Sequence, residues 1–302
     1  MTLPPVPDPS AGRRGPRRSV RTLPLKLPSV IVLLLWAVVP LVMTIWFSFE
    51  RYNLLNAGER GFAGLENYRF LLTDPGLAKV IINTVLLVGG VLAITVGLGT
   101  LLAVLFDQSF FGRGAARLLV IAPFFVMPTV SALIWKNMLM DPVNGVLAFL
   151  MRGVGLRPVD WFSGAPLAAI VIIVAWQWLP FALLILLTAL QSLDPESRES
   201  ARMDGAGPFA MFFFIVLPHL RRAIGVVVMI ETVFLLTVFA EIFVTTAGGP
   251  GLASTNLAFL IYRFALLDFD IGGASAGGIQ AIILANVAAV FLMRTVSRSL
   301  ET

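Results

Sequence analysis

The sequence ESARMDGAGPFAMFFFIVLP, residues Glu199–Pro218, separates two hydrophobic runs that are each long enough to cross a bilayer. A short helix is predicted to begin just before this stretch and to end in its first half. Asp194 can cap the start of the helix, and Gly205 can adopt the left-handed conformation at its end. Its second half, Phe209–Leu217, is apolar but too short to span lipid, and we expect Pro218 to end it. The stretch therefore predicts a compact helical loop between two membrane helices.

The composition indicates a polytopic membrane protein. Of the 302 residues, 58% are hydrophobic and 13% are charged, whereas soluble domains carry about 25% charged residues. The net charge is +5, but the Lys and Arg residues are scattered over short segments, which argues against nucleic-acid binding. With no cysteine and one histidine, disulfides and thiolate metal sites are excluded, and we expect no metal site.

A nucleotide-binding P-loop is also excluded. The lysines are Lys26, Lys79 and Lys136, and none precedes Ser or Thr, as the P-loop lysine must. We therefore expect that the chain is not an enzyme and that another subunit hydrolyses any ATP that drives it.

Hydropathy predicts an all-α fold with six transmembrane helices. Residues 1–28 are rich in Pro and Arg and are expected to form a disordered cytoplasmic tail, followed by a membrane domain over residues 29–302. Lys and Arg are more frequent in the segments that lie inside if the N-terminus is cytoplasmic, which places both termini and the loop 194–220 in the cytoplasm. The predicted spans are Val30–Phe49, Val80–Leu105, Leu118–Met140, Leu167–Leu190, Ala223–Thr245 and Ile271–Met293.

The cytoplasmic loop resembles the signature of binding-protein-dependent ABC permeases, which reads EAA, three residues, Gly, nine residues, Ile-x-Leu-Pro. Here Glu199-Ser200-Ala201 leads at the same spacing to Gly205, and nine residues later the loop ends in Ile215-Val216-Leu217-Pro218. Ser200 in place of Ala is the one departure. The resemblance implies the MetI-like ABC permease fold. The plainer interpretation is a cytoplasmic helical hairpin without a partner.

This resemblance also implies partners and roles. The loop would be the coupling helix that sits in a cleft of an ATP-binding cassette ATPase dimer, which hydrolyses the ATP, while this chain binds no cofactor. A second homologous permease subunit and an extracytoplasmic solute-binding protein would complete the importer in the cell inner membrane. Glu199 would pair with a basic group of the ATPase, and Asp204 and Gly205 would set the turn. The coupling residues are Glu199, Ser200, Ala201, Asp204, Gly205, Ala206, Leu217 and Pro218.

Prolines and glycines interrupt several predicted spans. A proline inside a helix frees a backbone carbonyl and kinks the helix, and in transporters such breaks border substrate cavities, although a packing kink explains any single one equally well. The prolines are Pro40, Pro123, Pro128 and Pro180. Glycines of the second span favour close approach of a neighbouring helix; they are Gly89, Gly90, Gly97 and Gly99.

Two carboxylates, Glu231 and Glu241, lie within a predicted span, where a charge costs on the order of 3 kcal/mol. Phe234, Leu235 and Val238 follow Glu231 at helical spacing, so all four are predicted to share a face. The region is similar to maltose-type permeases, and this similarity implies that these four residues face the substrate. Extended backward, it implies further cavity-lining residues, namely Phe124, Gln177, Trp178 and Phe181.

Each of the polar residues in this region also has a structural interpretation. Glu231 could bond an amide on a neighbouring span, and the candidates are Asn83, Gln177 and Asn286. We expect Glu241, which is close to the external boundary, to extend outward to water rather than to contact ligand. His219 is expected to be a residue of the membrane boundary rather than part of a proton relay.

The external loop indicates the substrate class. Thr246-Ala247-Gly248-Gly249-Pro250 and the later Ile261-Tyr262 resemble the carbohydrate, MalF-like branch of the family, and Phe269-Asp270-Ile271-Gly272 resembles sorbitol/mannitol polyol permeases. The implied function is a membrane subunit of an ABC importer for a sugar or polyol. The alternatives are a self-sufficient secondary transporter that couples to protons through Glu231, and a membrane scaffold.

Overall fold

The computed structural model describes residues 23–301, with side chains from residue 26 to residue 290 except Ala57 and Ala289. Most of the predicted tail, residues 1–22, lies outside the described residues. The first helix, α1 (Leu23–Ser48), begins inside the segment assigned to that tail. The chain forms two compact units, one up to Met43 and one from Thr44 onward, and the second unit contains the helices that form the site.

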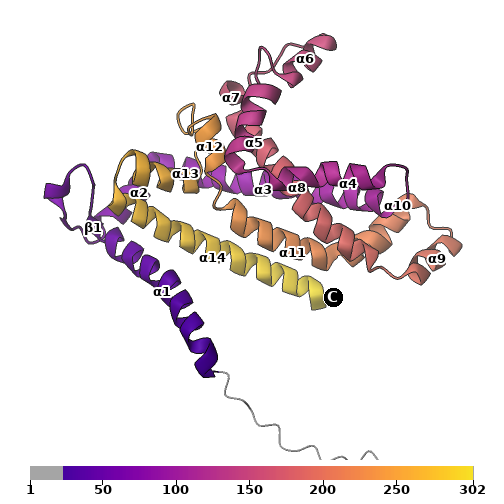
Figure 1. The fold of residues 1–302 in the computed structure, drawn as a ribbon, viewed down its shortest axis with the longest axis horizontal. Helices are drawn as coiled ribbons and strands as arrows, with labels where there is room; N and C mark the ends of the chain where they lie inside the picture. Colours follow the sequence, from indigo (N-terminus) through magenta and orange to yellow (C-terminus); the bar gives the residue numbers. More distant parts are fainter. Residues whose placement is uncertain (1–22, 302) are drawn as a thin grey trace, which may run out of the picture. The chain divides into compact units, whose positions relative to one another are not determined.

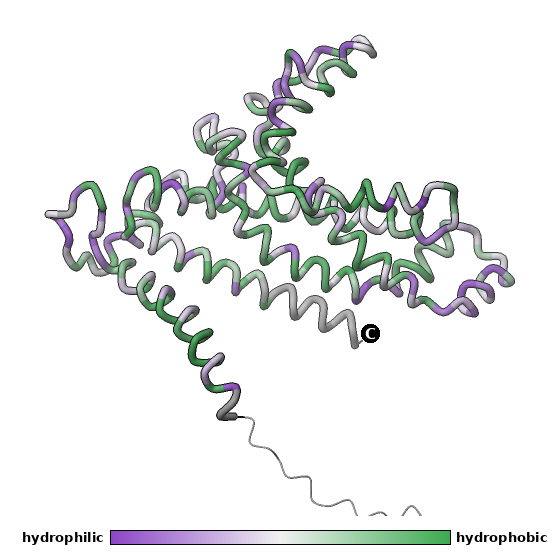
Figure 2. Tube along the Cα trace, viewed as in Figure 1, coloured by the Kyte–Doolittle hydropathy of each residue, from purple (hydrophilic) through white to green (hydrophobic). Residues whose placement is uncertain are grey.

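The second unit is built on long apolar helices. In the described part of the chain, α1 included, five helices are long and apolar enough to cross a membrane, or six if one bent pair forms a single span, which confirms the predicted fold class. Helices α3 (Pro75–Asp107), α8 (Pro166–Gln191), α11 (Leu217–Leu235) and α14 (Ile271–Glu301) run side by side (Figure 1). Figure 2 shows hydrophobic residues along them and hydrophilic residues over the α9 loop at one end.

Short elements connect these helices. A small antiparallel pair, β1 (Glu50–Arg51) with β2 (Gly61–Phe62), lies in the loop after α1. The short α-helices are α2 (Glu66–Thr73), α4 (Arg113–Ile121), α5 (Pro128–Ile134), α6 (Val146–Gly153), α7 (Trp161–Gly164), α9 (Pro195–Met203), α10 (Pro208–Met211), α12 (Ala240–Thr245) and α13 (Leu257–Tyr262). The 3-10 turns are η1 (Ala57–Glu59) and η2 (Ala122–Phe125), and the π-helical turns are η3 (Trp135–Leu139), η4 (Phe212–Val216) and η5 (Arg263–Leu267).

The third predicted span, Leu118–Met140, is broken rather than continuous. Arg113–Phe125 and Pro128–Leu139 meet at an angle of 111°. Val126 and Met127 between them are extended. Met127 directly precedes Pro128, and a residue before a proline is pushed out of the helical region. The corner at Pro128 is therefore sharper than a kink in a continuous span.

The fifth predicted span, Ala223–Thr245, is wrong at both ends. A continuous helical run extends from Pro208 to Leu235, and Pro218 does not end it. Pro218 lies in the first turn of α11, directly after the wide π turn η4, where a missing N–H is tolerated. At the other end the helix stops at Leu235, and the side chain of Asn256 donates to the freed Val238 carbonyl at 2.6 Å.

The contact between α3 and α8 uses only some of the predicted glycines. A Cβ atom at Gly90 would lie 3.1 Å from Val171, and one at Gly99 would lie 3.1 Å from the Ala182 Cβ and 3.5 Å from the Leu183 nitrogen. A Cβ atom at Gly89 or at Gly97 would meet nothing within 4 Å. Close approach therefore explains Gly90 and Gly99, but it does not explain the other two.

Gly99→Leu is expected to destabilise the fold, whereas Gly97→Leu serves as its control two residues away. Overpacking a tight helix contact typically costs about 1–3 kcal/mol of unfolding free energy, and a substitution into open space costs less than about 0.5 kcal/mol. The measurement is unfolding of the purified chain in mixed detergent micelles. Equal stability of the two variants would show that α3 and α8 do not pack as closely as described.

Candidate functional site

A cavity of about 360 Å³ lies where the broken third span meets α8, the end of α11 and the start of α12. Its walls are mostly aromatic and aliphatic, with a few polar side chains among them. The lining residues are Phe124, Val126, Pro128, Gln177, Trp178, Phe234, Thr237, Val238, Phe239, Ala240 and Glu241. The volume falls within the range of about 300–1,000 Å³ that is usual for small-molecule sites.

Five of the residues predicted to face substrate do line this cavity: Phe124, Gln177, Trp178, Phe234 and Val238. Trp178 forms the centre of an aromatic cluster, with its ring centroid 5.2 Å from that of Phe234 and 5.9 Å from that of Phe124. Phe181 is not a lining residue, but it stacks on Phe124 at 6.1 Å and so supports the wall from behind.

The structure does not place Glu231 and Leu235 at the cavity. Both are fully buried, and Leu235 packs in a hydrophobic cluster with residues of α3 and α8. The predicted common face fails within α11: Glu231 and Leu235, one turn apart, are buried in the bundle, whereas the neighbouring Phe234 lines the cavity. Of the original strip, Phe234 and Val238 face the cavity, whereas Glu231 and Leu235 face the helix bundle.

Glu231 has a structural partner, but it is not one of the predicted amides. The Thr95 hydroxyl donates to Glu231 Oε2 at 2.6 Å, and Glu231 Oε1 has no hydrogen-bond partner among the described residues. The predicted amides bond elsewhere: Asn83 donates to the Leu252 and Thr255 carbonyls, Gln177 to Val126, and Asn286 to Ile282. The sequence does not point to Thr95, because a hydroxyl in a membrane helix usually bonds its own backbone.

Glu241 lines the cavity, so the expectation that it reaches outward to water was wrong. Its side chain is 4% exposed. The residue lies in the first turn of α12, which is separated from α11 by residues 236–239. Because of this break, α12 turns toward the cavity wall. The fifth span predicted from the sequence, Ala223–Thr245, was one continuous helix and so did not include this change of direction.

The α9 loop forms as the sequence predicts in its first half. Asp194 caps α9 by accepting from the Glu196 amide at 3.1 Å, and Gly205 has φ +80°, in the left-handed region. Glu199, Ser200, Asp204 and Gly205 are exposed, Ala201 and Ala206 are half-buried, and Met203 is 87% exposed. Within the described chain, the Glu199 carboxylate makes no ion pair.

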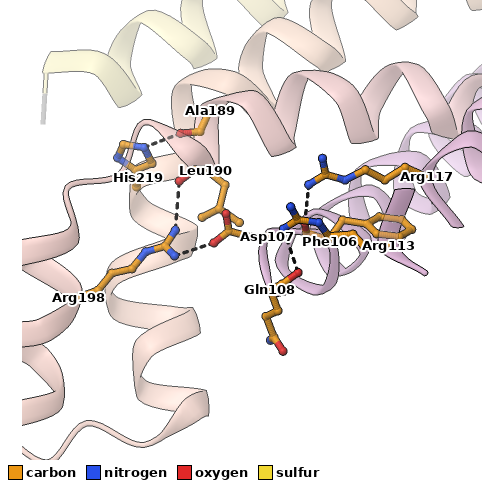
Figure 3. Close-up of polar contacts among 9 residues, drawn as sticks. All are labelled: Phe106, Asp107, Gln108, Arg113, Arg117, Ala189, Leu190, Arg198 and His219. Atoms are coloured by element: carbon orange, nitrogen blue, oxygen red, sulfur yellow. Dashed lines mark hydrogen bonds and ion pairs between the residues drawn. The ribbon is translucent and has the colours of Figure 1, made fainter. Parts of the chain in front are cut away.

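A set of polar contacts that sequence reasoning missed ties this loop to the bundle (Figure 3). Arg198 of α9 forms an ion pair with Asp107 at the end of α3, Nη1 to Oδ2 2.6 Å, and donates through Nη2 to the Leu190 carbonyl of α8 at 3.1 Å. His219 Nε2 lies 2.9 Å from the Ala189 carbonyl oxygen, which fits the boundary role expected for it. Nothing in the local sequence pairs Arg198 with Asp107.

A second cavity of about 430 Å³ lies between the end of α3 and the turn from α9 into α10. Ala206, one of the predicted coupling residues, lines it together with Gly207, Pro208 and Arg202. Leu217 and Pro218 lie further along the same continuous helix, in the first turn of α11. The predicted coupling residues therefore lie on α9, on the turn that follows it and on the helical run Pro208–Leu235.

Known proteins share features of this chain over most of its length. The family model described as "Binding-protein-dependent transport system inner membrane component" matches residues 27–302. The chain is 32% identical over 252 residues to the trehalose/maltose transport system permease protein MalF of Thermococcus litoralis, covering 82% of this chain and 84% of the relative. It is 31% identical over 275 residues to the sulfoquinovosyl glycerol transport system permease protein SmoG of Agrobacterium fabrum, covering 89% and 88%.

A solved structure resembles the fold as well. A chain of a bacterial ABC transporter involved in the import of the acidic polysaccharide alginate superposes with a TM-score of 0.77 at 24% sequence identity. The match covers 91% of this chain and 94% of that one.

Proposed function

This chain belongs to the family of binding-protein-dependent transport system inner membrane components and is an ABC transporter permease subunit, and on that premise we propose that it carries a sugar or polyol across the cell inner membrane. The carbohydrate assignment is supported by the similarity to a trehalose/maltose permease over most of both chains. A separate ATPase dimer supplies the energy, a solute-binding protein delivers the ligand, and a second permease subunit completes the pathway.

The observation that carries this proposal is the continuous helical run from the α9 loop to the cavity. Pro208 leaves the loop, and Phe234, at the other end of the same run, lines the cavity. At 1.5 Å per residue this run of 28 residues is about 42 Å long. A displacement of the loop is therefore delivered to the cavity wall by one rigid element.

In the mechanism that we propose, the ATPase dimer grips the exposed face of α9 and moves it when ATP binding closes the dimer. The α9–α10 turn displaces the Pro208–Leu235 run, and Arg198 pulls α3 through Asp107. Phe234 and the α12 segment then shift, and the cavity changes its access from one side of the membrane to the other. Hydrolysis of ATP resets the transporter.

The test is uptake of labelled maltose and labelled sorbitol into proteoliposomes that contain this chain, its ATPase, its second permease subunit and its binding protein. We expect uptake of at least one of them, and only when ATP is enclosed with the ATPase on the same side and every subunit is present. Uptake by this chain alone that stops on addition of a protonophore would instead support a secondary transporter, and uptake of neither compound would refute the carbohydrate assignment.

A further inference from the structure

The polar side chains of the cavity at Phe124–Glu241 offer mainly hydrogen-bond acceptors. Gln177 is 7% exposed, its Nε2 donates to the Val126 carbonyl at 2.7 Å, and its Oε1 has no hydrogen-bond partner in the described chain. The Thr237 hydroxyl donates its proton to the Phe234 carbonyl at 2.7 Å, which leaves only its lone pairs for a ligand. The donors among the described lining side chains are the indole N–H of Trp178 and the second N–H of Gln177 Nε2, which has one bond, to Val126.

Glu241 is the charged side chain among these lining residues, and it has no cation beside it. The ion pairs of the described residues are Arg51–Glu66, Arg60–Glu50, Arg198–Asp107 and Arg263–Asp268. Lys136, on the neighbouring π turn η3, donates instead to the Val244 carbonyl at 3.0 Å. A carboxylate this buried requires donors; its own backbone N–H is one, and further donors can come from the cavity that it lines.

The aromatic walls have the same preference. Phe124, Trp178 and Phe234 line the cavity, and the faces of aromatic rings attract ammonium groups and the C–H faces of sugar rings. An anionic group in this cavity would meet the aromatic walls and the Glu241 carboxylate. Both disfavour negative charge.

From these contacts we infer that Glu241 sets the charge selectivity of the cavity, so that it takes neutral carbohydrates and, with higher affinity, carbohydrates that bear an ammonium group. Those that carry a carboxylate, sulfate or phosphate are rejected. The inference rests on the proposed function, because it takes the cavity to be the passage of the substrate. The Thr237 lone pairs accept hydroxyl protons, while Glu241 accepts from the ammonium group or from a hydroxyl.

The test uses the full chain in lipid nanodiscs with three probes: glucosamine, maltose and glucuronate. Dissociation constants come from ligand-observed NMR at pH 7. Because opposite and like charges at contact distance differ strongly in energy, glucosamine is expected to bind at least about tenfold more tightly than glucuronate, with maltose between them. In Glu241→Gln this ratio is expected to fall below about threefold, while maltose binding changes little.

Two further variants make the result specific. Glu241→Asp keeps the charge and is expected to keep the ranking, and Glu59→Gln removes an exposed carboxylate outside the cavity and is expected to change nothing. If Glu241→Gln does not fold, the order of the three dissociation constants in the wild-type chain still tests the inference. Glucuronate binding as tightly as glucosamine, the absence of binding by any probe, or an unchanged ratio in Glu241→Gln would overturn the inference. ATP-driven uptake would remain intact in those cases, which separates this failure from failure of the proposed function.

Discussion

Gly205→Val is expected to abolish most ATP-driven uptake while the chain remains folded in the membrane. Gly205 has φ +80°, a conformation that costs a residue with a side chain roughly 1–2 kcal/mol and a β-branched residue more. A Cβ atom there would meet nothing within 4 Å, so the penalty arises from the backbone and not from crowding. The chain would relieve it by changing the turn between α9 and α10, which would displace α9 from the ATPase cleft that we propose it occupies.

If the strained turn weakens the docking of α9 by about 1.4 kcal/mol, the equilibrium constant for docking falls tenfold. Uptake is therefore expected to fall at least about tenfold. Gly155→Val is the matched control, because Gly155 has φ +78° and also has nothing within 4 Å, but lies in the loop after α6. The measurement is uptake and ATP hydrolysis in the same proteoliposomes. Normal uptake by Gly205→Val, or an equal loss in Gly155→Val, would refute the role assigned to this turn.

Asp107→Arg is expected to have the second large effect, because it replaces the ion pair that anchors α9 with a repulsion. The Arg198 and Asp107 side chains are 28% and 17% exposed, so their pair is only partly screened by solvent. Hydrogen bonds to charged groups of this kind are worth about 1.5–3 kcal/mol, and we expect uptake to fall roughly tenfold after allowance for screening.

The charge-swapped double variant, Asp107→Arg with Arg198→Asp, is expected to recover part of the uptake. Glu66→Arg is the matched control, because it breaks the Arg51–Glu66 pair, whose side chains are both 59% exposed, and such pairs contribute little. Binding of the purified ATPase to each variant identifies the step that fails. If the swap restores nothing while the single variant folds, the pair does not transmit force to α3.

Local chemistry was sufficient to predict the first half of the α9 loop. An Asp before a proline caps a helix, and a glycine after the last helical residue adopts the left-handed conformation; Asp194 and Gly205 do both. The expectation that a proline ends a helix was wrong at Pro218. The wide π turn η4 before this residue removes the clash between the proline ring and the preceding turn that normally ends a helix. A π turn has no sequence signature of the same strength.

The cavity could be predicted only in part for a similar reason. Phe124, Gln177 and Trp178 lie on its walls as the family resemblance implied, since the breaks that expose them are marked by prolines. Glu231 lies in the bundle beside Thr95 and Glu241 lines the cavity, because α11 ends at Leu235. Nothing in the local sequence marks this end, and the Asn256 side chain that bonds the freed Val238 carbonyl follows 18 residues later. The Arg198–Asp107 pair joins residues 91 positions apart, and nothing in the local sequence points to it.

The proposed mechanism requires that a separate ATPase binds the α9 loop from the cytoplasmic side. Because the chain has no cysteine, Met203→Cys introduces a unique thiol at a side chain that is 87% exposed on α9, and Phe149→Cys does the same on α6. We predict that a photoactivatable maleimide at position 203 crosslinks to the ATPase in the assembled importer, and that only position 149 reacts with a membrane-impermeant maleimide in intact cells. Labelling of position 203 from outside, or the absence of any crosslink to the ATPase, would contradict the account.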